Sequence, residues 1–191
     1  IWIASYPKSG NTWVRSLISS YYYSDDGIFD FDLLENIHQY PSPRYFKEKV
    51  TKPGEISYYW KSSQERIVKN NKNIFLKTHN ALVSLNENPF TSEKFSLGAI
   101  YIIRDPRNII TSLKNHYNFE NYNTSIEFML SEKKYLWDNR YKNDYTLFQF
   151  LGSWSNHYKS WLQNKNFKIF FIKYEDLEKN IQTVLFEMIK F

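Results

Sequence analysis

Four short apolar runs recur along the chain, and each ends in a polar segment. They cover residues 2–5, 73–76, 99–103 and 168–173, and the segments that follow read "YPKSGNT", "KTHN", "RDPRN" and "YEDL". The last two runs have continuous apolar centres, as is typical of strands buried on both faces of a sheet. The pattern predicts four buried strands with polar residues at their carboxyl ends.

Helical patterns lie between or after these strands. We expect helices over residues 12–22, 106–116, 147–163 and 176–191. Asp105 and Pro106 suit the N-cap and the first position of the second helix. Residues 24–72 are rich in Pro, Tyr and Ser and weakly periodic, so we interpret them as helices and loops that cover one edge of the sheet. Strands that alternate with helices predict an α/β fold: three layers, with a central parallel sheet flanked by helices.

Length and composition narrow the class of protein. A chain of 191 residues favours a single domain, residues 1–191. The absence of cysteine excludes a disulfide framework and a cysteine metal site, and is compatible with a cytoplasmic location. No apolar run approaches the roughly 20 residues of a membrane span, and no signal peptide is visible. The net charge of +5 fits an anionic ligand, but no dense block of Lys and Arg indicates nucleic acid.

The segment after the first strand is nearly a phosphate-binding loop. In the frame of the Walker pattern G-x-x-x-x-G-K-S/T, Gly10 and Thr12 stand where expected, but Asn11 replaces the lysine and Lys8 comes earlier. A strand-to-helix turn still points backbone N–H groups and the positive helix end at one spot. Lys8 precedes this nest, so it can reach beyond a bound phosphate. Taken alone, the motif fits a tight turn with a surface lysine equally well.

Ligands of open parallel sheets bind beyond the carboxyl ends of the strands. Lys77 and His79 follow the second strand, and the strand period of two predicts that they face the same side. This pair suits an anion next to a proton acceptor, although His79 taken alone fits an ordinary hydrogen-bonded histidine. Arg104 follows the third strand and Ser112 lies about two turns into the next helix, where both can contact a phosphate. Alternatively, Arg104 could pair with Asp105 or cap surface carbonyls. Tyr174 follows the fourth strand and could pack on a purine or fill the core.

Other polar residues receive an ordinary structural interpretation. His38, His116 and His157 are expected to be hydrogen-bonded histidines with no chemical role. We expect Arg107 to pair with Asp105 or to cap surface carbonyls. Glu175 and Asp176 most simply begin the last helix, where acidic side chains favour the N-terminus.

Several of these segments match one known family. "SYPKSGNTWVRSLI", "FLKTH", "IYIIRDPRNIITSLKNHY", "GSWSNHYKSWL" and "FFIKYEDL" occur in the order, and at roughly the spacing, of the cytosolic-type sulfotransferases. The chain resembles that family over nearly its whole length. The resemblance implies a sulfotransferase domain with a P-loop-NTPase-like fold, 3′-phosphoadenosine 5′-phosphosulfate (PAPS) as sulfuryl donor, PAP as product, and no required metal.

The resemblance also implies catalytic roles. His79 would be the general base, and Lys8 and Lys77 would lie near the transferring group. Sulfuryl transfer resembles phosphoryl transfer, with in-line attack and charge that moves onto the leaving phosphate oxygen. A lysine near the bridging oxygen can stabilise that charge. A histidine with an unperturbed pKa of about 6.5 suits removal of the acceptor proton at neutral pH.

The donor-binding residues follow from the same resemblance. Arg104 and Ser112 would hold the 3′-phosphate, Tyr174 would contact the adenine, and Trp13 would pack against it. The loop around the 5′-phosphosulfate would consist of Lys8, Ser9, Gly10, Asn11, Thr12 and Trp13. The acceptor would be a small molecule, and phenol, alcohol and amine all stay open. Aromatic residues at 21–23, 40, 45, 58–60 and 119–122 could shape its pocket or belong to the core. A homodimer is also left open.

The sequence departs from the family pattern at two places. Asn11 stands where the family commonly has Thr, and an amide there keeps the backbone nest. Members usually carry an "RKG" segment well beyond "YED" that adds donor contacts, and these 191 residues contain none. The chain also begins without Met, inside an apparent strand. We therefore expect a domain truncated at both ends.

Two alternative functions stay open. The first is a P-loop nucleotide kinase or NTPase, which is disfavoured by Asn11 in the lysine position and by the lack of a clear metal-binding Asp after an apolar strand. The second is an inactive nucleotide-binding fragment of a sulfotransferase, which the missing "RKG" segment supports.

Overall fold

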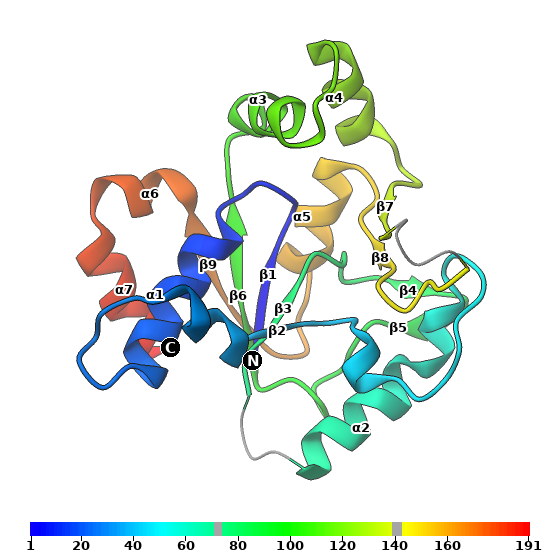
Figure 1. Ribbon diagram of the computed structural model, residues 1–191, viewed down its shortest axis with the longest axis horizontal. Helices are drawn as coiled ribbons and strands as arrows, with labels where there is room; N and C mark the ends of the chain where they lie inside the picture. The colour runs from blue at the N-terminus through cyan, green and yellow to red at the C-terminus, as the bar shows by residue number, and fades with distance from the viewer. Residues whose placement is uncertain (71–73, 139–142) are drawn as a thin grey trace.

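The computed structural model describes residues 1–70, 74–138 and 143–191. Within these residues, five parallel strands form the central sheet, in the order β2-β3-β1-β6-β9 (Figure 1). Their bounds are β1 (Trp2–Ser5), β2 (His38–Gln39), β3 (Leu76–Thr78), β6 (Gly98–Ile103) and β9 (Lys168–Lys173). Two small antiparallel pairs are separate from this sheet: β4 (Ser84–Leu85) with β5 (Asn88–Pro89), and β7 (Tyr135–Leu136) with β8 (Gln149–Phe150).

Helices cover both faces of the sheet and its carboxyl edge (Figure 1). One face carries α1 (Asn11–Tyr23), α6 (Tyr174–Lys179) and α7 (Ile181–Lys190), and the other carries α2 (Trp60–Asn70) and α5 (Trp154–Leu162). Near the carboxyl edge lie α3 (Pro106–Tyr117) and α4 (Tyr122–Leu130). Short 3₁₀ helices cover Phe31–Asn36, Pro43–Tyr45 and Glu55–Tyr59. The expected three-layer α/β fold is confirmed.

The alternation of side chains along β1 places the two halves of the core. Trp2 and Ala4 pack into the cluster that contains Trp161 of α5, whereas Ile3 packs into the opposite cluster with Val14 of α1. Successive side chains of a strand point to opposite faces of the sheet, so a buried strand contributes side chains to both clusters. The sheet is therefore apolar on both faces and exposes its polar residues at the strand ends.

Two expected helices are wrong in their bounds. The helix expected over 147–163 begins only at Trp154, because Gly152 adopts a φ of +64° and the Ser153 side chain caps the helix. Residues 149–150 before it pair as β8. The helix expected over 176–191 is two helices. Asn180 leaves the helical region with φ −152° and ψ 72°, and its side chain caps α7.

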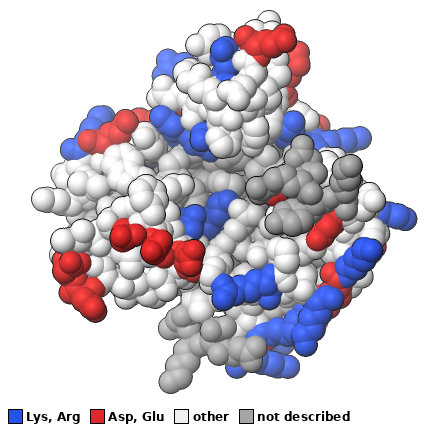
Figure 2. All heavy atoms as spheres, in the orientation of Figure 1, with Lys and Arg blue, Asp and Glu red and all other residues white. Residues whose placement is uncertain are grey.

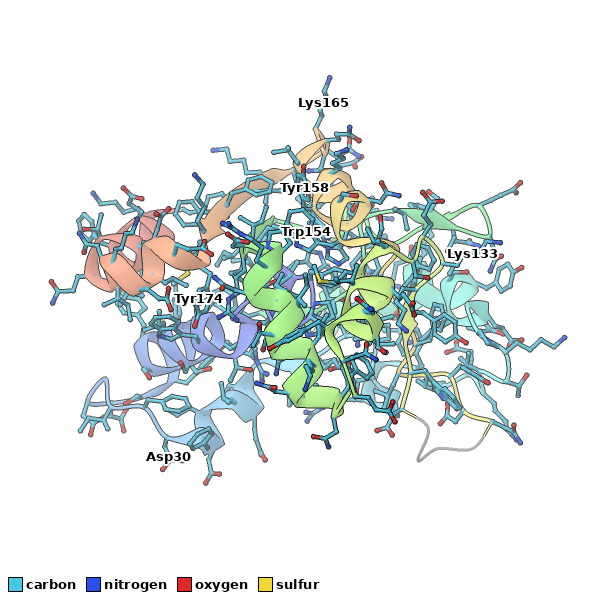
Figure 3. All side chains as sticks on the ribbon, turned by 90° about the horizontal axis from the view of Figure 1, so that it is seen from above. Asp30, Lys133, Trp154, Tyr158, Lys165 and Tyr174 are labelled. Atoms are coloured by element: carbon cyan, nitrogen blue, oxygen red, sulfur yellow. The ribbon has the colours of Figure 1, made fainter. Side chains whose placement is uncertain are left out.

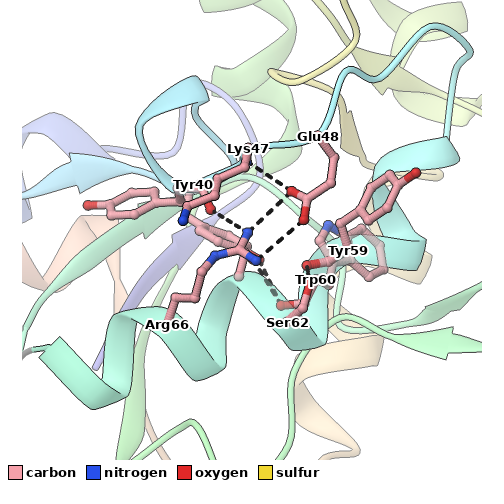
Figure 4. A network of polar contacts seen from close by, with 9 residues as sticks. Tyr40, Lys47, Glu48, Tyr59, Trp60, Ser62 and Arg66 are labelled. Atoms are coloured by element: carbon pink, nitrogen blue, oxygen red, sulfur yellow. Dashed lines mark hydrogen bonds and ion pairs between the residues drawn. The ribbon is translucent and has the colours of Figure 1, made fainter.

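The chain before β3 also differs from the expectation. The strand expected over 73–76 begins at Leu76 and ends at Thr78, and residue 73 lies outside the described residues. Residues 24–70 cover one edge of the sheet as expected, but they contribute a strand of their own, β2. Arg66 of α2 holds the segment after β2 in place (Figure 4). Its guanidinium contacts the Glu48 carboxylate at 3.2 Å and donates to the Tyr45 carbonyl at 3.1 Å.

Candidate functional site

A cleft of about 770 Å³ opens at the carboxyl edge of the sheet. Every binding or catalytic residue expected from the sequence lines it, with the exception of Ser9. Among the described residues that line the cleft there is no Asp or Glu. Four cationic side chains line it: Lys8, Arg15, Lys77 and Arg104. Figure 2 shows Lys and Arg atoms within a hollow below the α3–α4 layer. The cleft is therefore suited to an anionic ligand.

The loop between β1 and α1 forms one wall of the cleft. Lys8 and Gly10 both adopt positive φ angles, of 66° and 95°. Gly10 is the N-cap residue of α1, and because it has no side chain it makes no side-chain cap hydrogen bond. The first backbone N–H groups of a helix lack partners inside the helix, and they carry the positive end of its dipole. This geometry matches the nest expected for a phosphate.

Two side chains of the loop point inward. The Ser9 hydroxyl is buried and has no hydrogen-bond partner in the described part of the chain. Asn11 directs its amide back to the strand: Nδ2 donates to the Ile3 carbonyl at 3.1 Å and to Ser5 Oγ at 3.3 Å. Asn11 thus fixes the loop to β1, and its position beside the cleft supplies no cation in place of the Walker lysine.

Arg104 and Tyr174 meet at the ends of β6 and β9. The preceding residues Ile103 and Lys173 are partners in the sheet register, which brings the two side chains together. The Arg104 guanidinium carbon lies 4.0 Å from the Tyr174 ring centre, and a terminal nitrogen donates to the Lys8 carbonyl at 2.9 Å. Its Nε is buried without a partner among residues 1–70, 74–138 and 143–191, and the residue itself lines the cleft.

Aromatic rings close this end of the cleft. Trp13 and Tyr174 form an edge-to-face pair with ring centres 5.5 Å apart. Tyr174 lies between α6 and α1 in the view from above (Figure 3). Its ring lies so close to Gly10 that a Cβ there would come within 2.5 Å of it. Glycine is thus required at this position both for its backbone angle and for the approach of the ring.

Lys77 projects from β3 and donates to Gln39 Oε1 at 2.7 Å. Burial, and then the positive charge of Arg15, lowers the pKa of Lys77 to about 7. An ammonium group in such a place gains from any anion that enters the cleft.

His79 follows β3 and lines the same cleft as Lys77, as the strand period predicts. Its Nδ1 lies 2.7 Å from the Ser5 carbonyl, which can only accept, so Nδ1 carries the hydrogen in the neutral ring. Nε2 is then the nitrogen with the lone pair. Burial, followed by the charge of Lys77, holds the pKa of His79 well below its usual value. The backbone N–H of His79 donates to Gln149 Oε1 at 2.7 Å.

The structure adds lining residues that the sequence interpretation missed: Pro7, Arg15, Ser16, Phe29, Phe31, Gln39, His116, Tyr117, Leu136 and Gln149. His116 was expected to have an ordinary role, but it lines the cleft. Its i+4 spacing from Ser112 on a helix was the available signal. Burial, and then the charge of Lys8, lowers the pKa of His116. Gln39 belongs to the strand that was not expected, so no local signal indicated it.

The remaining ordinary interpretations agree with the contacts. His157 is buried, with Nε2 3.0 Å from the His79 carbonyl and Nδ1 2.8 Å from the Tyr101 hydroxyl. His38 contacts Arg44, and Arg107 pairs with Asp105, the N-cap of α3. Among the aromatic candidates, Tyr40, Tyr45, Tyr59 and Trp60 belong to or pack on the core, while Tyr21–Tyr23 are exposed on α1.

The described residues contain neither a membrane-spanning helix nor a cluster of metal-ligating side chains. No described helix has both the length and the apolar character needed to cross a membrane. No group of three or more His, Cys, Asp or Glu side chains in the described ranges is arranged to hold a metal ion.

Known proteins share both sequence and fold with this chain. Dog (Canis lupus familiaris) sulfotransferase 1B1 is 27% identical over 93% of this chain and 53% of its own length. Rabbit (Oryctolagus cuniculus) amine sulfotransferase is 22% identical over 100% of this chain and 55% of its own length. The structure of mouse sulfotransferase SULT7A1 complexed with PAP covers 98% of this chain and 56% of its own, with a TM-score of 0.54 and 23% identity. The chain spans about half the length of the curated relatives it matches.

The family is shown by a match over the whole chain. The family model described as "Sulfotransferase domain" matches residues 1–191, which include all four strand-end segments that form the cleft. The parallel sheet with its flanking helices is the fold of the mouse protein as well. This chain belongs to the sulfotransferase domain family.

Proposed function

We propose that this domain transfers a sulfuryl group from PAPS to a hydroxyl, or an amine, of a small acceptor. One observation carries the proposal: the nest at Gly10, the pair Arg104 and Ser112, and the neutral His79 all line one cleft without acidic residues in its described lining. An anion-binding wall and a proton acceptor are the two parts that such a transfer requires. The presence of PAP in the mouse structure supports this choice of donor.

The residues of the cleft fit the charges of PAPS. The loop that contains Ser9 and the first turn of α1 would hold the 5′-phosphosulfate, and Arg104 with Ser112 would hold the 3′-phosphate. Trp13 and Tyr174 would hold the adenine between the two anion sites. When bound, PAPS supplies the sulfuryl group, whose bond to the phosphate oxygen breaks as a bond to the acceptor oxygen or nitrogen forms.

Three side chains would take part in the transfer. His79 would remove the proton from the acceptor hydroxyl or amine with Nε2, because Nδ1 donates its hydrogen to the Ser5 carbonyl. Its lowered pKa keeps it unprotonated at neutral pH, ready to act as a base. Lys8 and Lys77 place positive charge beside the group being transferred and the departing phosphate. A general base such as His79 typically increases the rate about 10²–10⁴-fold.

The nucleotide kinase alternative has less support from the same geometry. The Asn11 side chain contacts the backbone of β1 and offers no charge in the Walker lysine position. Asp105 caps α3 and pairs with Arg107, so it is engaged away from any metal site. Neither feature favours an ATP–Mg²⁺ site.

Calorimetry of ligand binding tests the proposal. We expect the chain to bind PAP in preference to ATP–Mg²⁺, and Arg104→Ala to lose at least about tenfold in PAP affinity, as for one charge-assisted contact. Arg107→Ala is the matched control, since its side chain is exposed and paired with Asp105. Preference for ATP–Mg²⁺, or equal losses in the two variants, would contradict the donor assignment. Tight PAP binding without turnover of phenols, alcohols or amines would indicate an inactive nucleotide-binding domain instead.

A further inference from the structure

One contact in the cleft joins a residue of the matched motifs to a residue outside them. Lys77 Nζ donates to Gln39 Oε1 at 2.7 Å, and both side chains line the cleft. The two residues are register partners in the parallel pair of β2 and β3. The register of β2 with β3 therefore places the two side chains next to each other on the same face of the sheet.

The surroundings of Lys77 contain cations and one neutral acceptor. Arg15 approaches from α1, where its guanidinium donates to the Leu34 and Ile37 carbonyls at 2.9 and 2.8 Å. His79 stands two residues further along from Lys77, and His38 stands beside Gln39 on β2, where it contacts Arg44. On β1 the register partner of Lys77 is the apolar Ile3. No Asp or Glu lines the cleft among the described residues, and the residues outside the described ranges include none in the sequence.

We propose that Gln39 is a positioning residue for Lys77: its neutral oxygen accepts the hydrogen bond that holds the lysine amine in the cleft and places no negative charge beside it. A carboxylate at this position would instead pair with the ammonium and keep it charged. An apolar side chain would leave a buried ammonium with no acceptor. The inference rests on the proposed function for the role of Lys77, but the contact itself is independent of it.

A consequence for donor binding follows from linkage. Lys77, whose pKa is about 7, is partly deprotonated at neutral pH. An anion in the cleft favours the charged amine, so binding of PAP takes up a proton at Lys77. The affinity for PAP then falls as the pH rises above about 7, by up to about tenfold per pH unit. Because Gln39 contacts the Lys77 amine, it affects the pKa of Lys77 and therefore the pH at which the affinity for PAP begins to fall.

NMR titration of the lysine side chain in the ligand-free protein tests the proposal directly. The Lys77 ¹³Cε resonance is assigned by its absence in Lys77→Arg. Gln39→Glu is expected to raise the pKa of Lys77 by about one unit or more, because an opposite charge within hydrogen-bond distance stabilises the ammonium. Gln39→Met, which is similar in size and has no oxygen, is expected to lower it. Gln163→Glu, at the exposed end of α5 outside the cleft, controls for an added remote charge and should leave the pKa unchanged.

Opposite shifts in the two Gln39 variants would support the inference, because a general loosening of β2 would move both in the same direction. An unchanged Lys77 pKa in Gln39→Glu, or equal shifts in Gln39→Glu and Gln163→Glu, would overturn it. Each Gln39 variant has its own expected direction, so either one decides the matter if the other fails to fold.

PAP binding measured from pH 6 to 9 separates this inference from the proposed function. We expect the fall in affinity to begin at higher pH in Gln39→Glu than in the wild type. PAP binding that falls at the same pH in both proteins would overturn the positioning role and leave the donor assignment intact. A wild-type chain that binds no PAP would overturn the proposed function, while the NMR titration would still test the contact.

Discussion

Substitution of Gly10 by alanine gives the sharpest test of how the loop and the nucleotide end of the cleft fit together. The φ of Gly10 is 95°, in a region that L-residues adopt at a cost of roughly 1–2 kcal/mol. An added Cβ would also lie 2.5 Å and 2.8 Å from two carbons of the Tyr174 ring. Contacts that short do not persist, so the ring or the loop must move, and overpacking of this kind typically costs about 1–3 kcal/mol.

We therefore expect Gly10→Ala to lower the free energy of unfolding by about 2–5 kcal/mol, a large part of the roughly 5–15 kcal/mol that holds a domain folded. Gly27→Ala is the matched control. Gly27 also has a positive φ, of 76°, but apart from its chain neighbours no described residue has an atom within 4 Å of the added Cβ, so the backbone strain of about 1–2 kcal/mol is the expected cost. The difference between the two variants isolates the steric contact with Tyr174.

Urea unfolding with the slope held common to all variants measures these losses. Movement of Tyr174 also disturbs the Arg104 guanidinium, 4.0 Å from the ring centre, so PAP affinity should fall at least about tenfold in Gly10→Ala and stay unchanged in Gly27→Ala. In the Tyr174→Ala background, Gly10→Ala should cost less stability than in the wild type, by the steric part of the loss. The reasoning is refuted if Gly10→Ala and Gly27→Ala are destabilised equally, or if Gly10→Ala costs as much in the Tyr174→Ala background as in the wild type.

Two further predictions concern the histidines. His79→Ala should reduce sulfuryl transfer about 10²–10⁴-fold, as expected for loss of a base, with little change in PAP affinity; transfer equal to that of the wild type in a phenol assay would show that another group takes the proton. His157 is buried, and burial lowers its pKa to about 4, below the value of about 6.5 in an unfolded chain. The unfolded state thus binds the proton more tightly, so stability should fall by about 3 kcal/mol as the pH is lowered from about 6.5 to 4. His157→Gln should lose less over that range in urea unfolding, and an equal loss would contradict this assignment.

The sequence by itself determined the architecture and most of the cleft. The apolar runs at β1 and β6 mark strands that are buried on both faces, as continuous apolar runs typically do, whereas the run at β9 lies at one end of the described sheet and is only partly buried. Polar residues at the ends of parallel strands converge on one edge of the sheet. For this reason the segments at Lys8, Lys77, Arg104 and Tyr174 could be expected to share a site before any contact was known.

The tertiary structure decided the features that depend on contacts between distant segments. The edge strand β2 is two residues long, and its pairing with β3 is what brings Gln39 to Lys77. The sequence places Asn11 in the loop, and only the structure shows that its side-chain amide donates to a backbone carbonyl of β1. Burial and neighbouring cations set the pKa values of Lys77 and His79, and neither cause is visible in the order of residues. Local sequence determines which segments can meet, and the packing of distant segments determines the electrostatic environment where they do.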